Sequence, residues 1–192
     1  MDEAGRGPIA GPVSVGAVAF LKPFDALVFE GVRDSKQLSP PRRSYFRSVV
    51  ESLSEAGTMS FAVRSVDAGS IDQGGIVPAI RTALEAALSA LSLAPHEVVL
   101  KLDGSLRAPT IYKRQETIIR GDEIELPITL AGIMAKTTRD ALMEEYARDF
   151  PQYGFEKHKG YGTKLHYQAI REHGLCPLHR ASFIDLTNLH DM

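Results

Sequence analysis

The sequence has little of what stabilises proteins outside the cell or in a membrane. It contains a single cysteine, Cys176, so no disulfide can form within the chain, as is typical of proteins in the reducing cytoplasm. No apolar run approaches the ~20 residues that a membrane-spanning helix needs, and the charged first residues do not resemble a signal peptide. We therefore expect a soluble, cytoplasmic protein.

The chain also lacks a strong overall charge. Its formal net charge is -2, so any nucleic-acid binding must depend on local basic patches rather than on global charge. Two such patches exist, at residues 31–50 and 101–120, each with five basic residues and no more than two acids. Runs of this kind usually lie on solvated helix faces, so they do not predict binding by themselves.

No internal repeat, linker or low-complexity tract divides the 192 residues, which favours one domain with a substantial core. Hydrophobic periodicity predicts strands at residues 13–21, 58–66, 97–103 and 115–120. It predicts helices at residues 42–56, 78–93, 127–150 and 163–173, and loops at 70–75 and 151–162. A helix followed by a buried strand is typical of a crossover in an α/β sheet.

Two adjacent carboxylates, Asp2 and Glu3, begin the chain just before a glycine-flanked arginine. Neighbouring side chains of a regular strand point to opposite faces, but Gly5, Gly7 and Pro8 predict that the strand ends and turns over here. Acids beside backbone amides and an arginine are suited to a hard cation and a phosphate. An ordinary surface turn accounts for the same residues equally well.

Two further acids are placed by the predicted elements. Asp103 ends a strand and precedes Gly104, and ligands bind at the carboxyl edge of open α/β sheets, although Asp-Gly is also a common turn. Asp140 follows Ile133 by two helical turns, so it is expected to face the sheet. The stripe that defines this face is Leu130, Ile133, Met134, Thr137 and Ala141.

A carboxylate that faces the core needs a partner. For Asp140, the spacing allows either Lys136, four residues earlier, or a metal ion shared with Asp2, Glu3 and Asp103. Such an all-carboxylate set selects Mg²⁺ or Mn²⁺ over zinc. The five histidines at positions 158, 166, 173, 179 and 190 have no cysteine partner, and we expect them to be solvated or held in the core.

Five motifs, in order along nearly the whole chain, resemble those of type 2 ribonuclease H, in particular bacterial ribonuclease HII. The opening motif is DEAGRGP followed by AGPV, at residues 2–8 and 10–13, and the second is Asp34-Ser35-Lys36 with Leu38. The third is Asp103-Gly104, and the fourth is Ala135-Lys136 followed by Arg139-Asp140. The fifth is HKGYGT at residues 158–163, with His166 and with His179-Arg180-Ala181-Ser182-Phe183.

The resemblance implies an RNase H-like fold: a mixed five-stranded sheet flanked by helices, with a helical C-terminal region. Residues 1–150 would form the catalytic core and residues 151–192 an extension packed on it, within one continuous domain. The implied activity is cleavage of the RNA strand of RNA-DNA hybrids and nicking on the 5′ side of single ribonucleotides in duplex DNA. Products would carry a 3′-hydroxyl and a 5′-phosphate, and the role would be ribonucleotide removal in DNA repair and replication.

By the same resemblance, two Mg²⁺ or Mn²⁺ ions would be held by Asp2, Glu3, Asp103 and Asp140. Gly5-Arg6-Gly7 would read the 2′-hydroxyl of the ribonucleotide, with close approach of the backbone. Tyr161 would stack on the next sugar, although packing at a helix start is an alternative. Lys36 would meet a phosphate near the cut, and the basic patch from Arg33 to Arg47 would then face the duplex.

The sequence departs from the family pattern in two places. Only Met1 precedes Asp2, where family members usually have several strand residues, and 126–132 replaces a serine- and alanine-rich helix start. A short first strand supports an alternative function, a catalytically impaired paralogue that binds hybrids. A recombinase or resolvase of the same fold is a further alternative, which the Gly5-Arg6-Gly7 and Tyr161 pair opposes. Residues 186–192 carry no clear sliding-clamp motif with paired aromatics, so we expect a monomer.

Overall fold

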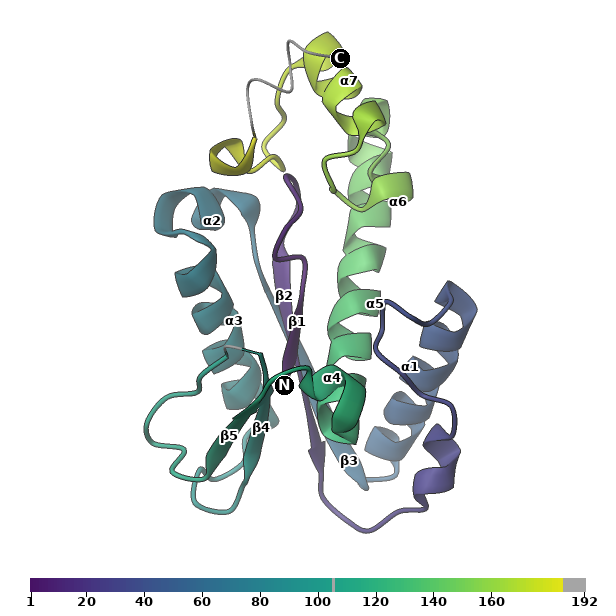
Figure 1. Cartoon of the computed structure of the whole chain (residues 1–192), viewed down its shortest axis with the longest axis vertical. Coiled ribbons are helices and arrows are strands. Elements are labelled where there is room, and N and C mark those ends of the chain that lie inside the picture. The colour runs from purple at the N-terminus through teal and green to yellow at the C-terminus, as the bar shows by residue number, and fades with distance from the viewer. Residues whose placement is uncertain (105, 185–192) are drawn as a thin grey trace.

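Five strands and the helices around them are seen in a computed structural model, which describes residues 1–104 and 106–184 (Figure 1). The strands are β1 (Asp2–Ala4), β2 (Val13–Phe20), β3 (Met59–Val66), β4 (Leu100–Asp103) and β5 (Gln115–Ile118). The main helices are α1 (Pro40–Glu55), α2 (Ala68–Gly74), α3 (Ile76–Leu91), α5 (Leu126–Asp149) and α7 (Lys164–His173). Two shorter helices are α4 (Gly121–Ile124) and α6 (Phe155–His158), and three 3-10 turns are Ala26–Phe29, Pro151–Tyr153 and Ala181–Phe183.

The strands form a mixed sheet. β1 and β3 each run antiparallel to β2, with Asp2 opposite Gly16, while β4 and β5 are parallel to each other. The two groups meet at Met1, whose amino group donates to the Lys101 carbonyl at 2.7 Å and whose carbonyl accepts from Asp103 N at 3.0 Å. This is the hydrogen-bond pattern of parallel strands, and it joins the three-stranded sheet β1-β2-β3 to the two-stranded sheet β4-β5. The combined order is β3-β2-β1-β4-β5. The predicted mixed five-stranded sheet is confirmed.

Helices cover both faces of this sheet, with α3 on one side and α5 on the other (Figure 1). Val15 and Ala17 of β2 join the buried cluster formed with α3. Gly16 between them faces α5, where a Cβ would lie 2.2 Å from the Ala131 carbonyl oxygen. Strand alternation therefore explains both faces, and the glycine lets α5 approach the backbone of β2.

The C-terminal region packs on the far end of α5 (Figure 1). Its buried cluster includes Phe155, Tyr167 and Ile170, and it also takes in Ile9 and Ala10 from the connection between β1 and β2. No helix among the described residues is long and apolar enough to cross a membrane.

The helical and strand periodicities predicted most elements to within a few residues, but residues 70–75 were wrongly expected to be a loop. Residues 70–74 lie in α2 and Gly75 is its C-cap, while Asp67 caps the start of the helix by accepting from Ser70 N at 2.8 Å. The glycines and polar residues of this segment resembled a loop because the helix is short and largely exposed. The strand expected at 97–103 begins only at Leu100, and the loop expected at 151–162 contains a 3-10 turn and α6.

Candidate active site

Asp2 is a buried carboxylate at the centre of the sheet, only 7% exposed. Its Oδ2 lies against Gly132 of α5, where a Cβ would approach to 2.3 Å, so a larger residue at position 132 would displace the carboxylate. Its Oδ1 accepts from Glu3 N at 2.7 Å. Helix α5 and strand β1 together fix the position of this side chain.

Like charges surround Asp2. Burial, followed by the carboxylates of Glu3 and Asp103 and then Asp122, raises the pKa of Asp2 to about 8. Burial also raises the pKa of Glu3, although Arg6 Nη1 lies 3.4 Å from Glu3 Oε1 and opposes the shift. The site therefore has more negative charge than the nearby cations neutralise.

Asp103 stands at the carboxyl end of β4, at the same sheet edge as the end of β1. Its Oδ1 accepts from Gly121 N, the first residue of α4, at 2.7 Å. Asp122 follows in that helix, and burial together with Asp103 and Asp34 raises its pKa. Asp122 was not among the predicted site residues; it comes shortly after β5, the parallel partner of the strand that ends at Asp103, so it lies at the same edge of the sheet.

Lys36 borders this acidic cluster, with Nζ 4.0 Å from Asp122 Oδ2 and a side chain that is 75% exposed. Partial burial lowers the pKa of Lys36, but the carboxylates of Asp34, Asp2, Asp122 and Asp103 outweigh it and the net shift is upward. The ammonium group thus stays charged at the edge of the site, where it is accessible to solvent.

The basic patch around Lys36 is partly occupied by contacts within the protein. Arg43 donates to the carbonyls of Ser35 at 2.9 Å and Leu38 at 2.5 Å, and so holds the loop that carries Lys36. Arg47 donates to Thr137 and Thr138 of α5 and pairs with Glu51. These two arginines order the site, which leaves the exposed members of the patch for a ligand.

Asp140 is bound to cations of the protein. Lys136 Nζ lies 2.6 Å from its Oδ1 and Arg43 Nη2 lies 4.0 Å from its Oδ2. The structure therefore contains the Lys136 pair that the spacing had allowed. The predicted core stripe is displaced at this end of the helix, because Ala141 is exposed while Arg139 is buried.

The donors fit a hard cation. Asp2, Glu3 and Asp103 supply only oxygen ligands, and a divalent ion would offset the repulsion and burial that raise the pKa of Asp2. Within residues 1–104 and 106–184, no three carboxylate, imidazole or thiol groups are already arranged around one cation position. Recruiting Asp140 requires it to exchange Lys136 for the ion.

The loop after β1, residues 5–12, is held by two buried arginines that we did not predict as functional. Arg180 donates to the carbonyls of Gly5 at 2.7 Å, Arg6 at 3.1 Å and Gly11 at 2.9 Å. Arg139 donates to the carbonyls of Pro12 at 2.8 Å and Ala10 at 3.1 Å, and to Lys159 at 2.9 Å. Among the described residues neither guanidinium has a carboxylate within 4.0 Å, so backbone oxygens are their hydrogen-bond partners.

These contacts fix which way the loop presents its amides. In a trans peptide the carbonyl and the following N–H point in opposite directions. With the Gly5 and Arg6 carbonyls turned toward Arg180, the N–H groups of Arg6 and Gly7 face away from it, and they have no acceptor in the described part of the chain. Gly5 has φ +89, and a Cβ there would lie 2.0 Å from Arg139 Nε, so only glycine fits.

Two histidines, His166 and His179, support the loop that carries Tyr161. Cys176 N donates to His179 Nδ1 at 2.9 Å, which leaves the proton on His179 Nε2 to donate to His166 Nε2 at 3.1 Å. His166 Nδ1 then donates to the Tyr161 carbonyl at 2.9 Å. Burial lowers the pKa of His166 to about 4, so the chain of hydrogen bonds is neutral.

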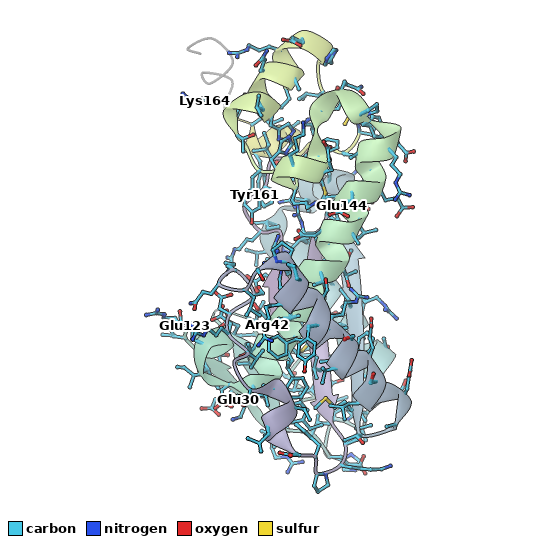
Figure 2. The ribbon with its side chains drawn as sticks, turned by 90° about the vertical axis from the view of Figure 1, so that its right-hand side faces the viewer. Glu30, Arg42, Glu123, Glu144, Tyr161 and Lys164 are labelled. Atoms are coloured by element: carbon cyan, nitrogen blue, oxygen red, sulfur yellow. The ribbon has the colours of Figure 1, made fainter. Side chains whose placement is uncertain are left out.

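The Tyr161 ring itself is 46% exposed and has no ring contact among the described residues. Figure 2 shows it at the edge of the molecule, on the same side as Glu123 of α4. The exposed ring opposes the alternative in which Tyr161 is a packing residue. His166 and His179 are buried and hydrogen-bonded, His158 is half-buried and His173 is exposed, which agrees with the solvated or core positions expected for these four; His190 lies outside the described residues.

The sequence and the fold of the chain both match known proteins. The family model described as Ribonuclease HII matches residues 1–186. Ribonuclease HII of Pelodictyon phaeoclathratiforme is 42% identical over 95% of this chain and 87% of its own length. The ribonuclease HII in the PCNA complex from Archaeoglobus fulgidus has a TM-score of 0.77 at 23% identity, covering 100% of this chain and 95% of that one. Bst-RNase HIII in complex with Mn²⁺ has a TM-score of 0.72 at 18% identity, covering 98% and 67%.

Proposed function

The chain belongs to the ribonuclease HII family and is a ribonuclease H, and on that premise we propose that it both cleaves the RNA strand of RNA-DNA hybrids and nicks duplex DNA 5′ of a single embedded ribonucleotide. The products are a 3′-hydroxyl and a 5′-phosphate, as needed for ribonucleotide removal in repair and replication. The acidic cluster of Asp2, Glu3 and Asp103, beside a loop that presents two free amides, is the observation that carries this proposal.

Asp2, Glu3, Asp103 and Asp140 would hold two Mg²⁺ or Mn²⁺ ions. Bound divalent ions of this kind activate water and stabilise the departing 3′ oxygen in an in-line displacement. The raised pKa of Asp2 and the oxygen-only donor set support this assignment, and a fold neighbour was solved with Mn²⁺. Lys136 holds the Asp140 carboxylate in place through the 2.6 Å ion pair, and a bound ion would take its place.

Gly5-Arg6-Gly7 would select the ribonucleotide. The outward N–H groups of Arg6 and Gly7 can donate to the 2′-hydroxyl or to the adjoining phosphate. Deoxyribose lacks the 2′-hydroxyl, and a displaced backbone would move the phosphate out of reach, so neither would accept both hydrogen bonds. Gly7 is suited to this because it is exposed and has nothing within 4 Å of a Cβ position. The Tyr161 ring would stack on the next sugar and Lys36 would contact a phosphate.

The direct test is a labelled DNA duplex with one ribonucleotide, incubated with Mg²⁺ or Mn²⁺ and compared with an all-DNA duplex and an RNA-DNA hybrid. We expect one nick 5′ of the ribonucleotide, none in the all-DNA duplex, and multiple cuts in the hybrid. Asp103→Asn is the matched inactive variant, since Asn keeps the acceptor for Gly121 N and loses the charge.

If the wild type binds the duplex without cutting it, the result supports the impaired paralogue instead. If the wild type shows no binding and no cleavage, the proposal is refuted. We further propose a cytoplasmic monomer, supported by the single free thiol of Cys176. Light scattering checks the monomer. The predicted lack of a sliding-clamp motif falls mainly on residues 186–192, which lie outside the described residues.

A further inference from the structure

A basic cavity opens next to the loop of residues 5–12, on α3 and the segment after β4. It measures about 240 Å³, and its rim carries three arginines, Arg6, Arg81 and Arg107. Val77, Ile80 and Leu84 of α3 form its apolar floor, and Val77 is 63% exposed. Arg6 belongs to both the loop and this cavity, so the two surfaces are continuous.

The acidic groups of the described residues neutralise the positive charge of the three arginines only in part. Arg107 is exposed and has no hydrogen bond or ion pair within the part of the chain that is described. Arg81 pairs with Glu85 one turn along α3, but its side chain remains 73% exposed, so the guanidinium can reach a second anion. Arg6 makes only a long, 3.4 Å contact with Glu3.

An apolar floor under a ring of guanidinium groups matches a sugar-phosphate backbone. Guanidinium forks bind phosphate oxygens, and phosphate contacts fix the position of a duplex without reading its sequence. The aliphatic floor suits the hydrophobic face of a deoxyribose. An acidic peptide would use the charges, but the shared Arg6 joins this cavity to the loop proposed to hold a nucleotide.

We propose that this cavity binds the sugar-phosphate backbone of the substrate duplex beyond the ribonucleotide and extends the footprint of the enzyme across α3. The inference rests on the proposed function, because it takes the duplex to be held at Gly5-Arg6-Gly7. Arg81 and Arg107 then contribute to affinity and register, with no part in the chemistry.

The test compares duplex binding by the wild type, the double variant Arg81→Ala with Arg107→Ala, and the single variant Val77→Glu. Fluorescence anisotropy is measured in Ca²⁺ across a salt series. We expect the double variant to bind about tenfold more weakly and to lose about 2 from the slope of log affinity against log salt, because two phosphate contacts are removed. Val77→Glu adds an acid to the cavity in the first turn of α3, where it is favourable for the helix, and it should weaken binding with both arginines present.

Lys22→Ala with Lys113→Ala is the matched control, since it removes the same charge from two exposed lysines outside the cavity. A second series shortens the DNA arm on either side of the ribonucleotide, and the defect of the double variant should vanish when one particular arm becomes too short to reach the cavity. Inorganic phosphate at matched ionic strength and an acidic peptide serve as competitors.

Equal salt slopes for the wild type and the double variant, or an equal loss in the lysine control, would overturn the inference while leaving the proposed function intact. Displacement of the duplex by the peptide but not by phosphate would also overturn it. If the wild type neither binds nor nicks the duplex, the proposed function fails first. Melting temperatures of all variants show that they are folded.

Discussion

Replacing Arg180 with methionine should separate the positioning of the loop of residues 5–12 from the stability of the fold. The side chain is fully buried and donates three hydrogen bonds, to the carbonyls of Gly5, Arg6 and Gly11. At about 1.5 to 2 kcal/mol for each bond to a charged group, their loss costs about 5 kcal/mol. Burial lowers the pKa of Arg180 to about 10, so removing the charge returns about 3 kcal/mol.

The expected net loss is thus about 2 kcal/mol, which for a chain of this size lowers the melting temperature by roughly 4 to 8 °C. The effect on cleavage should be larger. With the carbonyls released, the Arg6 and Gly7 amides lose their fixed direction, and misplacement of about 1 Å in a reacting complex costs on the order of 100-fold in rate. We therefore expect kcat/KM on a single embedded ribonucleotide to fall about 100-fold at a temperature where the variant is fully folded.

The assay measures kcat/KM on the embedded ribonucleotide and on a continuous hybrid, with folding followed by circular dichroism. Leu88→Ala, a core change in α3 worth about 2 to 5 kcal/mol, is the stability-matched control and should keep its activity while folded. Arg180→Lys keeps the buried charge without the planar fork that meets three carbonyls, so it should restore neither the stability nor the kcat/KM of the wild type. A folded Arg180→Met enzyme with wild-type kcat/KM would refute the positioning role.

Three further predictions concern the titratable and exposed groups. The folded pKa of Asp2, about 8, lies above the ordinary value of 3.8, so the stability that protonated Asp2 contributes is complete below pH 3.8 and is lost as pH rises through 8. In EDTA at pH 9, urea unfolding should find Asp2→Asn about 5 kcal/mol more stable than the wild type, yet inactive. His166 has a folded pKa of about 4 against 6.5, so in the Asp2→Asn background, where the opposing titration of Asp2 is absent, the free energy of unfolding should fall by at most about 3 kcal/mol from pH 6.5 to 4, and a flat profile in that background would contradict this. Tyr161→Ala should lower nicking of single embedded ribonucleotides with little change in melting temperature, and a loss of folding instead would restore the packing role.

The fold was predictable where periodicity was strong. β2, β3, α3 and α5 carry clear patterns of two or 3.6 residues, and each was found close to its predicted bounds. α2 was missed because short exposed helices bury too few residues to leave a stripe. The shortened start of β4 follows from the same limit, since an apolar run does not reveal where strand pairing begins.

The candidate site was predictable to a smaller extent. Asp103 could be placed at a strand end, but the neighbouring Asp122 depends on the parallel pairing of β4 with β5, which residue spacing does not encode. The prediction that Asp140 has a cationic partner is confirmed by its ion pair with Lys136. Whether Asp140 binds Lys136 or a metal ion depends on the difference in free energy between the two, which the residue spacing does not reveal. Its environment also depends on Arg43, which comes from a different helix nearly 100 residues earlier.

The buried arginines explain why the conformation of the loop of residues 5–12 cannot be predicted from its own sequence. Gly5 and its Arg180 partner are 175 residues apart, and Pro12 and Arg139 are 127 apart, so the side chains that hold the loop lie far from it in the sequence. Arginine is suited to this because one planar fork meets three carbonyls, which a single ammonium group cannot do with the same geometry. A charge buried this deeply persists only if its hydrogen bonds offset the loss of water, so the carbonyl directions are specified tightly. The elements that present the Arg6 and Gly7 amides therefore belong as much to the C-terminal region as to the catalytic core, which favours a single continuous domain over two separable parts.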